Sequence, residues 1–201
     1  MSGRLKIVLA SASPRRKELL EQLGVPFEVV DPGEVEEAAS GSPEEVVSRN
    51  SLAKVLRVAR DLEEGIVVGA DTVVVKGDRI LGKPRGPAEA KEMLRALSGS
   101  SHRVLTGIAV VDAGTGRVES DVVETLVSML PLSEEDIDRY LASGEPLGKA
   151  GGYAIQGLGA VLVEGIDGCF HNVVGLPLSS LSTLLRKFSV NVMPCADSPS
   201  G

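Results

Sequence analysis

Short apolar runs alternate with amphipathic segments along most of the chain. The run at residues 5–10 predicts a buried strand, and the segment that follows places three leucines on one helical face before Gly24, which is positioned to end that helix. Ser13 is typical of a helix N-cap, and Pro14 suits the first helical position. The pattern therefore opens with strand, turn and helix, and the first helical turn presents free backbone amides.

The same alternation continues to about residue 188. It predicts strands at 27–30, 66–75, 103–112 and 117–129, and helices at 43–60, 87–97, from 133 onward and at 177–188. Ser42 opens a capping-box pattern, Ser133 to Asp136 cap a further helix, and residues 144–168 are dense in glycine. Alternating strands and helices indicate an α/β protein. Because 103–112 and 117–129 are adjacent and can pair antiparallel, we expect a mixed sheet flanked by helices.

Length and composition are those of one globular unit. The chain has 201 residues, of which 43% are hydrophobic, enough for one continuous core. We expect a single domain over 1–190 and a C-terminal tail over 191–201. The N-terminal apolar run at 7–10 is too short for a signal-peptide core or a membrane span, so we expect a cytoplasmic protein without a membrane contact.

Charge and the rarer side chains narrow the chemistry. A formal net charge of −7 argues against binding a long nucleic acid, although a few clustered cations still suffice for a small anion. Cys169 and Cys195 have no C-x-x-C spacing, so neither a zinc site nor a disulfide framework is indicated. His102 and His171 lie far apart and outside any nucleophile-elbow pattern. We expect both histidines to be structural.

The turn Ser11-Ala12-Ser13-Pro14-Arg15-Arg16 is the strongest local signal. It places hydroxyls, two guanidinium groups and a helix N-terminus at the end of a strand, an arrangement that holds phosphate oxygens well. An ordinary capped helix with surface arginines explains this segment alone equally well. The turn therefore predicts a phosphate site only in combination with other residues.

Asp71 interrupts the apolar run at 66–75. A buried carboxylate is costly unless it serves a metal or a partner, which favours a functional role over a carboxylate satisfied by backbone amides at a strand bend. Lys83 follows a short hairpin, and Lys54 projects from the second predicted helix, so both can reach the same anionic site. Singly, each lysine is more typical of a solvated surface cation.

The glycine-rich segment 149–157 combines a cation, an amide and three glycines, so its backbone can approach a ligand closely. The stretch before it is superficially similar to a P-loop. Only three residues separate Gly144 from Gly148, however, and Ala150 stands where a hydroxyl residue is required, which excludes a Walker A motif.

Taken together, the motifs resemble those of the Maf family over residues 5 to about 188. The segments that carry the resemblance are Leu9 to Arg16, Gly69 to Thr72, Gly82 to Pro84, Ser98-Gly99, Thr106-Gly107, Lys149 to Gly157 and Asn172 to Pro177. The resemblance implies a fold similar to that of inosine triphosphatases. It also implies a pyrophosphatase that hydrolyses nucleoside triphosphates to the monophosphate and pyrophosphate.

The resemblance assigns roles to individual positions. Asp71 matches the proton acceptor and Glu37 an acidic metal-site residue, with Glu34 and Glu36 as alternatives for the glutamate. The positions that match phosphate-binding residues are Ser11, Arg15, Arg16, Lys54 and Lys83. We hypothesise that Asp71 orients or deprotonates the attacking water, and that Asp71 and Glu37 hold a divalent cation, Mg²⁺ or Mn²⁺.

The substrate branch is also implied by the resemblance. Arg15, Thr72 and Gln156 are similar to the set that marks the dTTP/UTP branch, which favours dTTP, UTP or modified pyrimidine nucleotides as substrates. A homodimer is a further expectation of the family. Two alternatives stay open: a nucleotidyltransferase, and a nucleotide-binding regulator of cell division or septum formation that binds without turnover.

Overall fold

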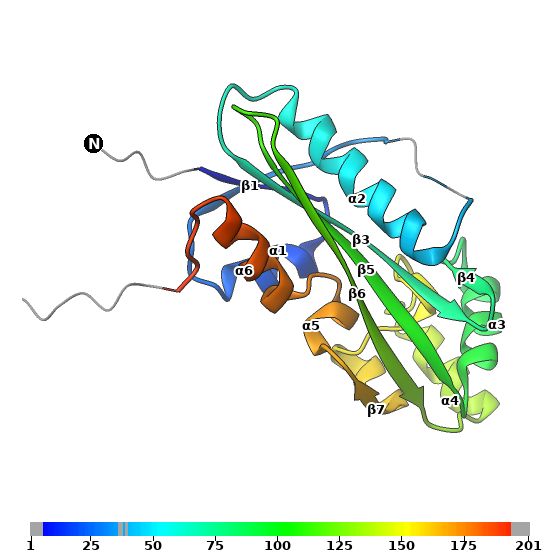
Figure 1. The fold of residues 1–201 in the computed structure, drawn as a ribbon. Coiled ribbons are helices and arrows are strands. Elements are labelled where there is room, and N and C mark those ends of the chain that lie inside the picture. The colour runs from blue at the N-terminus through cyan, green and yellow to red at the C-terminus, as the bar shows by residue number, and fades with distance from the viewer. Residues whose placement is uncertain (1–5, 36–37, 39, 194–201) are drawn as a thin grey trace, which may run out of the picture.

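A seven-stranded mixed sheet forms the centre of the molecule (Figure 1). The computed structural model describes residues 6–35, 38 and 40–193. The strands, in the order β2-β1-β3-β5-β6-β7, are β2 (Phe27–Val30), β1 (Ile7–Ala10), β3 (Ile66–Lys76), β5 (Ser101–Asp112), β6 (Val118–Met129) and β7 (Val163–Asp167), with β4 (Arg79–Leu81) paired to β3. β1 runs parallel to β2 and β3, and the other pairs are antiparallel. The expected mixed sheet is confirmed.

Helices flank both faces of this sheet. They are α1 (Pro14–Glu21), α2 (Pro43–Ala59), α3 (Pro87–Leu97), α4 (Glu134–Ala142), α5 (Phe170–Val174) and α6 (Leu178–Lys187), with short 3₁₀ turns η1 (Ala150–Gly152) and η2 (Gly157–Leu162). α2 covers one face along the length of the three long strands, and the other helices lie on the opposite face or at the far end (Figure 1).

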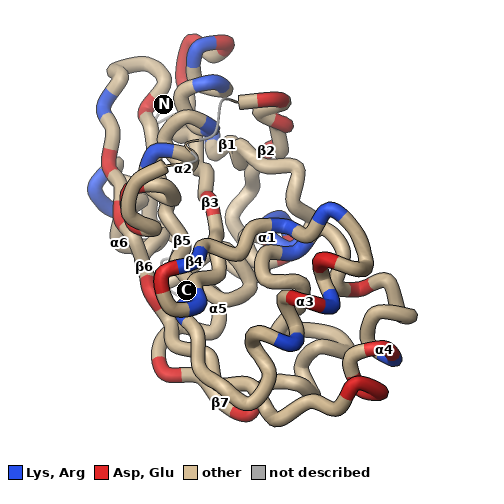
Figure 2. Tube along the Cα trace, turned by 90° about the vertical axis from the view of Figure 1, so that its right-hand side faces the viewer, with Lys and Arg blue, Asp and Glu red and all other residues tan. Residues whose placement is uncertain are grey.

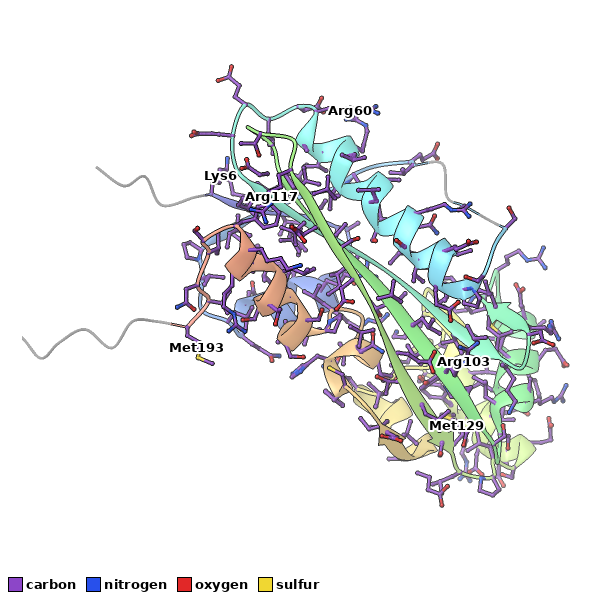
Figure 3. The ribbon with its side chains drawn as sticks, in the orientation of Figure 1. Lys6, Arg60, Arg103, Arg117, Met129 and Met193 are labelled. Atoms are coloured by element: carbon purple, nitrogen blue, oxygen red, sulfur yellow. The ribbon has the colours of Figure 1, made fainter. Side chains whose placement is uncertain are left out.

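The core follows the alternation of the long strands. Val67 and Val73 of β3 face α2, whereas Val68 and Ala70 pack with α1 and α6 in a first cluster on the opposite face. Further along that face, Val74 belongs to a second cluster with α3 and α4. The two clusters lie side by side and form two separate cores on one face of the sheet. β6 runs along both, from next to Arg117 at one end to Met129 at the other (Figure 3).

Two glycines let α2 lie close to the sheet. A Cβ added at Gly69 would approach Val55 Cγ1 to 2.6 Å, and one added at Gly107 would approach the carbonyl oxygen of Val47 to 2.3 Å. Real Cβ atoms do not tolerate such contacts, so both positions require glycine for packing. The polar side chains of α2 are thereby brought down onto β3.

The predicted helix starts are mostly confirmed. Ser42 and Ser133 each accept a hydrogen bond from the backbone of the third helical residue, and each forms a full capping box. Ser13 is the N-cap of α1, but its side chain makes no capping bond. The Ser13 backbone N–H donates to Ser11 Oγ at 3.2 Å, so Ser13 takes the expected N-cap position without a capping bond from its side chain.

The glycine-rich region contains elements that periodicity did not predict. η1, η2, β7 and α5 all fall between 150 and 174, where the apolar runs are too short to indicate an element. At the C-terminal end, Val192 lies inside the expected tail but is buried and packs into the first core cluster. Cys195 lies outside the described residues. None of the helices built from described residues is long and apolar enough to cross a membrane.

Candidate functional site

The main cleft opens at an edge of β3 that two other strands share. β1 pairs with β3 only as far as Val68, and β4 pairs with it only from Val74. Among the described residues, no strand pairs with this edge between those two positions. A cleft of about 850 Å³ lies there, and its walls come from the turn before α1, from α2, from β3 and β4, and from the loop around residue 149.

Asp71 lies on the wall of this cleft that faces α2. Its Oδ1 accepts from Lys54 Nζ at 2.5 Å, and its Oδ2 accepts from Asn50 Nδ2 at 3.1 Å. The side chains of Asp71 and Lys54 are only 14% and 15% exposed. Asp71 is therefore held by side chains of α2, and the alternative of a carboxylate satisfied by backbone amides at a strand bend is wrong.

Thr72 points to the other face, where it meets α1 and the end of α5. Thr72 Oγ1 accepts from Arg16 Nη2 at 3.1 Å and lies 2.9 Å from Thr106 Oγ1. Arg16 Nε also donates to the Gly175 carbonyl at 2.8 Å. Arg15 was expected to form the substrate-discriminating set with Thr72 and Gln156, but Arg16 is the arginine whose side chain contacts Thr72.

The turn before α1 is built as a phosphate site requires. Ser11 is buried, and its backbone N–H donates to the carbonyls of Leu9 and Val30, which fixes the end of β1. Arg15 and Arg16 both line the cleft. Burial lowers the pKa of Arg15, a shift that nearby Tyr140 and Glu145 partly oppose. Such a guanidinium group has lost part of its hydration, which favours an anionic ligand.

Two further lysines line the cleft. Lys83 is exposed and follows β4, while Lys149 is half-buried and donates from Nζ to the carbonyl of Glu145 at 2.5 Å. Burial lowers the pKa of Lys149, and the positive charge of Arg15 lowers it further. The described residues lining the cleft include five cations, Arg15, Arg16, Lys54, Lys83 and Lys149, and two carboxylates, Asp31 and Asp71.

Gln156 does not line the cleft. It is half-buried at the start of η2, although its neighbour Ile155 does line the cleft. Glu145 fixes this part of the chain, because its carboxylate accepts from the backbone N–H groups of Leu158 and Gly159 at 3.0 and 2.9 Å. The place of Gln156 in the set that marks the dTTP/UTP branch stays a prediction.

The metal assignment depends on an acidic segment that is only partly described. Glu36 and Glu37 lie outside the described residues, and Glu34 is exposed and does not line the cleft. Within the described part of the chain, no group of three or more His, Cys, Asp or Glu side chains is placed to hold a metal ion. Asp31 and Asp71 are the two carboxylates among the described residues that line the cleft, and Asp71 pairs with Lys54.

The histidines do not contribute to the cleft. His102 is buried, and its Nε2 lies 2.7 Å from the Tyr153 hydroxyl. Burial lowers the pKa of His102 to about 4, with a further contribution from Lys76, so the ring is neutral at physiological pH. Neither His102 nor His171 is among the described residues that line the cleft.

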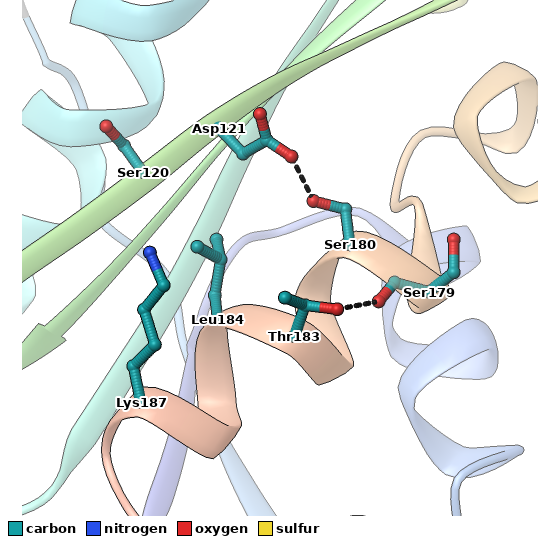
Figure 4. Close-up of a pocket in the computed structure, with 7 residues that line it drawn as sticks. All are labelled: Ser120, Asp121, Ser179, Ser180, Thr183, Leu184 and Lys187. Atoms are coloured by element: carbon teal, nitrogen blue, oxygen red, sulfur yellow. Dashed lines mark hydrogen bonds between the residues drawn. The ribbon is translucent and has the colours of Figure 1, made fainter.

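A second hollow between β6 and α6 lacks this chemistry. Its volume is about 380 Å³, and it is lined mainly by hydroxyl side chains (Figure 4). Ser180 donates to Asp121, and Thr183 donates to the Ser179 carbonyl at 3.1 Å. Its one lining cation among described residues, Lys187, is paired with Glu119 at 2.8 Å. In the view of Figure 2, Lys and Arg positions are interspersed with Asp and Glu positions along the chain. Because five cations and Asp71 line the first cleft and the second hollow has only a paired lysine, the cleft at Asp71 is the candidate site.

The sequence patterns do not indicate two residues of the cleft as site candidates. Asn50 is not indicated at all, and Lys149 is indicated only as part of a glycine-rich loop. The signal for Asn50 is its spacing: it precedes Lys54 by four residues and so shares its helical face. The signal for Lys149 is its place directly before a segment whose glycines allow close backbone approach.

The chain is similar to known proteins over most of its length. The family model described as Maf-like protein matches residues 6–188. A protein of Pelotomaculum thermopropionicum named dTTP/UTP pyrophosphatase is 48% identical over 189 residues, which cover 94% of this chain and 99% of the relative. Proteins with the same name from Dictyoglomus thermophilum and Bacillus cereus are 48% and 50% identical, with 94% and 93% of this chain covered and 98% and 92% of the relatives.

Two solved structures are similar at lower identity. The Ham1 protein of Staphylococcus aureus has a TM-score of 0.43 and 19% identity over 62% of this chain and 70% of its own. A nucleoside-triphosphatase, or dITP/XTP pyrophosphatase, from Mycobacterium abscessus has a TM-score of 0.42 and 15% identity over 92% of this chain and 96% of its own. The match of the family model over residues 6–188 and the relatives of nearly equal length show that this chain belongs to the Maf family.

Proposed function

We propose that this protein is a divalent-metal-dependent nucleoside triphosphate pyrophosphatase that cleaves dTTP and UTP between the α- and β-phosphates. The observation that carries the proposal is the position of Asp71, a carboxylate held by Lys54 and Asn50 inside a cleft lined by cations. Binding a polyanion alone would not require a carboxylate at this place, since it repels the ligand. The names of the relatives support the reaction and the substrate class.

The cations of the cleft suit the triphosphate chain. Arg15 and Lys149 are both partly desolvated and line the same cleft, and Lys83 adds a third, solvated charge. Cations of this kind pair with the charged oxygens of a bound triphosphate. We assign these three residues to the β- and γ-phosphates, together with the hydroxyl and backbone amides of the turn that begins at Ser11.

Asp71 has the position required of a proton acceptor. Both of its oxygens accept hydrogen bonds from α2, so the carboxylate is fixed, and its remaining lone pairs are available to a water in the cleft. Asp71 also fits a Mg²⁺ or Mn²⁺ ion, because such ions take one or two carboxylates and complete their shell with phosphates and water. Glu37 is the proposed second ligand, with Glu34 and Glu36 as alternatives. When bound, the ion neutralises charge that develops on the phosphates.

The proposal is tested by product analysis. The purified protein is incubated with Mg²⁺ or Mn²⁺ and with dTTP, UTP, CTP, GTP or 7-methyl-GTP, and the products are separated by chromatography. We expect monophosphate and pyrophosphate, formed fastest from dTTP and UTP. Orthophosphate as the first product contradicts cleavage at the α-phosphate. Tight binding without hydrolysis supports a regulator instead, and pyrophosphate released only with an acceptor supports a nucleotidyltransferase.

Lys149 provides a test of the phosphate site. Lys149→Met keeps most of the apolar stem and removes the charge, and we expect it to raise the KM for dTTP about tenfold, the loss of roughly 1.4 kcal/mol of binding. The value of kcat should stay within about threefold, because the group binds phosphates at a distance from the attacked atom. Steady-state kinetics measure both.

Lys187→Met is the matched control, since Lys187 lines the second hollow and pairs with Glu119. Its KM should equal that of the unmodified protein. An unchanged KM in Lys149→Met would remove Lys149 from the phosphate site.

A further inference from the structure

Asn50 lines the cleft, but no part in phosphate or metal binding is assigned to it above. It is 3% exposed and lies on α2 one helical turn before Lys54. Its Nδ2 donates to Asp71 Oδ2 at 3.1 Å, and its Oδ1 accepts from the Ala38 backbone N–H at 2.7 Å. A buried amide with both ends engaged connects two otherwise separate walls of the cleft.

Chemistry alone fixes the orientation of this amide. A backbone N–H can only donate, so the atom that faces Ala38 must be the amide oxygen. The NH₂ group must then face Asp71, where it can only donate, and Asp71 Oδ2 must accept. With Lys54 on Oδ1, neither oxygen of Asp71 can turn away without losing a bond.

The other end of the link is the segment before α2. Ala38 lines the cleft together with Asp31, Pro32 and Gly33, and the candidate metal glutamates lie between these positions. Because an N–H that is shielded from water costs free energy when it loses its acceptor, the bond from Ala38 to Asn50 holds Ala38 at the cleft.

We propose that Asn50 is a positioning residue that aligns the Asp71 carboxylate for the hydrolytic step and ties the Ala38 backbone to the same cleft. The proposal rests on the proposed function, because alignment of Asp71 matters only if Asp71 takes part in hydrolysis. Asn50 touches neither nucleotide nor water in this role and acts through Asp71. Its loss therefore lowers kcat more than it raises KM.

A double-mutant cycle tests the part of the proposal that concerns Asp71. Asn50→Leu has nearly the same shape and removes both hydrogen bonds. We expect it to lower kcat for dTTP about 30-fold, with KM within about threefold. In an Asp71→Asn background, the same substitution should lower the residual kcat less than about threefold, because Asn50 then has no carboxylate to align. Equal losses in both backgrounds indicate a general structural effect and overturn the proposal.

Backbone hydrogen exchange tests the second part without relying on activity. The Ala38 amide should exchange slowly in the unmodified protein and fast in Asn50→Leu. Asn50→Asp separates the two roles at a pH at which both carboxylates are ionised, because it then still accepts from Ala38 but cannot donate to Asp71, whereas at lower pH the two carboxylates can share a proton. We expect Asn50→Asp to lose kcat as Asn50→Leu does while keeping the Ala38 amide protected. Fast exchange of Ala38 in the unmodified protein overturns the link, even if Asn50→Leu fails to fold.

Ser51→Ala is the matched control. Ser51 is fully buried on the same helix, and its hydroxyl donates to the Ser48 carbonyl of that helix, away from Asp71. Its kcat and its Ala38 exchange should match those of the unmodified protein. An unmodified protein that binds dTTP without hydrolysis contradicts the proposed function. Normal hydrolysis by Asn50→Asp contradicts only the role of Asn50.

Discussion

Replacing Asp71 by asparagine should lower kcat for dTTP by about 10³-fold, within the range that general acid–base catalysis contributes. The asparagine keeps the shape of the side chain, but its one carbonyl oxygen can accept only from the donor that it faces, either Asn50 or Lys54, and its NH₂ group leaves the other donor without an acceptor. It cannot take a proton from water at neutral pH, and it is a weaker ligand for a divalent cation. Pyrophosphate release at saturating dTTP measures the loss, and circular dichroism verifies the fold.

Asp121→Asn is the corresponding control, because Asp121 is a carboxylate of the second hollow that accepts from Ser180 (Figure 4). We expect it to keep the kcat of the unmodified protein. If folded Asp71→Asn retains more than about a third of the normal kcat, its role as proton acceptor is excluded, since general-base catalysis supplies at least about 10²-fold.

Replacing Gly107 by alanine should lower the free energy of unfolding by about 3 kcal/mol or more, an overpacking cost at the upper end of the usual range. The added methyl would lie 2.3 Å from the Val47 carbonyl oxygen, which belongs to the backbone of α2 and cannot rotate away. For a chain of this length, such a loss shifts Tm by about 6–12 °C. Thermal unfolding measures the shift.

Gly165→Ala is the control for this substitution. Gly165 lies in β7, and a Cβ there would meet no atom within 4 Å. Its Tm should stay within about 2 °C of the unmodified protein, as for surface substitutions in general. A Tm of Gly107→Ala in the same range would show that α2 does not need to lie close to β5.

Much of the fold follows from local signals. Ser42 and Ser133 mark helix starts because a capping box is formed within four residues, so sequence alone contains all the parts. Ser13 takes the predicted N-cap position of α1, but its side chain makes no capping hydrogen bond, a detail that the sequence pattern does not decide. β7 and α5 were not predicted, because their apolar side chains are few and pack against distant strands.

The candidate site was predictable where charge contradicts burial. Asp71 could be recognised because it interrupts an apolar strand, and the structure places it among the expected cations. The pairing of Thr72 with Arg16 instead of Arg15 was not predictable. Adjacent residues on a helix point about 100° apart, so their targets depend on the angle at which α1 packs. Asn50 carries no charge, and only the register of α2 against β3 shows its role.

The edge of β3 that faces the cleft has no paired strand between Val68 and Val74 in the described part of the chain, whereas β5 pairs with the other edge throughout. β1 and β4 are both attached to the cleft edge of this one strand, so the twist of β3 sets how far apart the two walls of the cleft lie. A substitution on the buried face of β3 that changes this twist can therefore change the fit of a nucleotide from a distance. The spacing between the walls is thus a property of a single continuous strand.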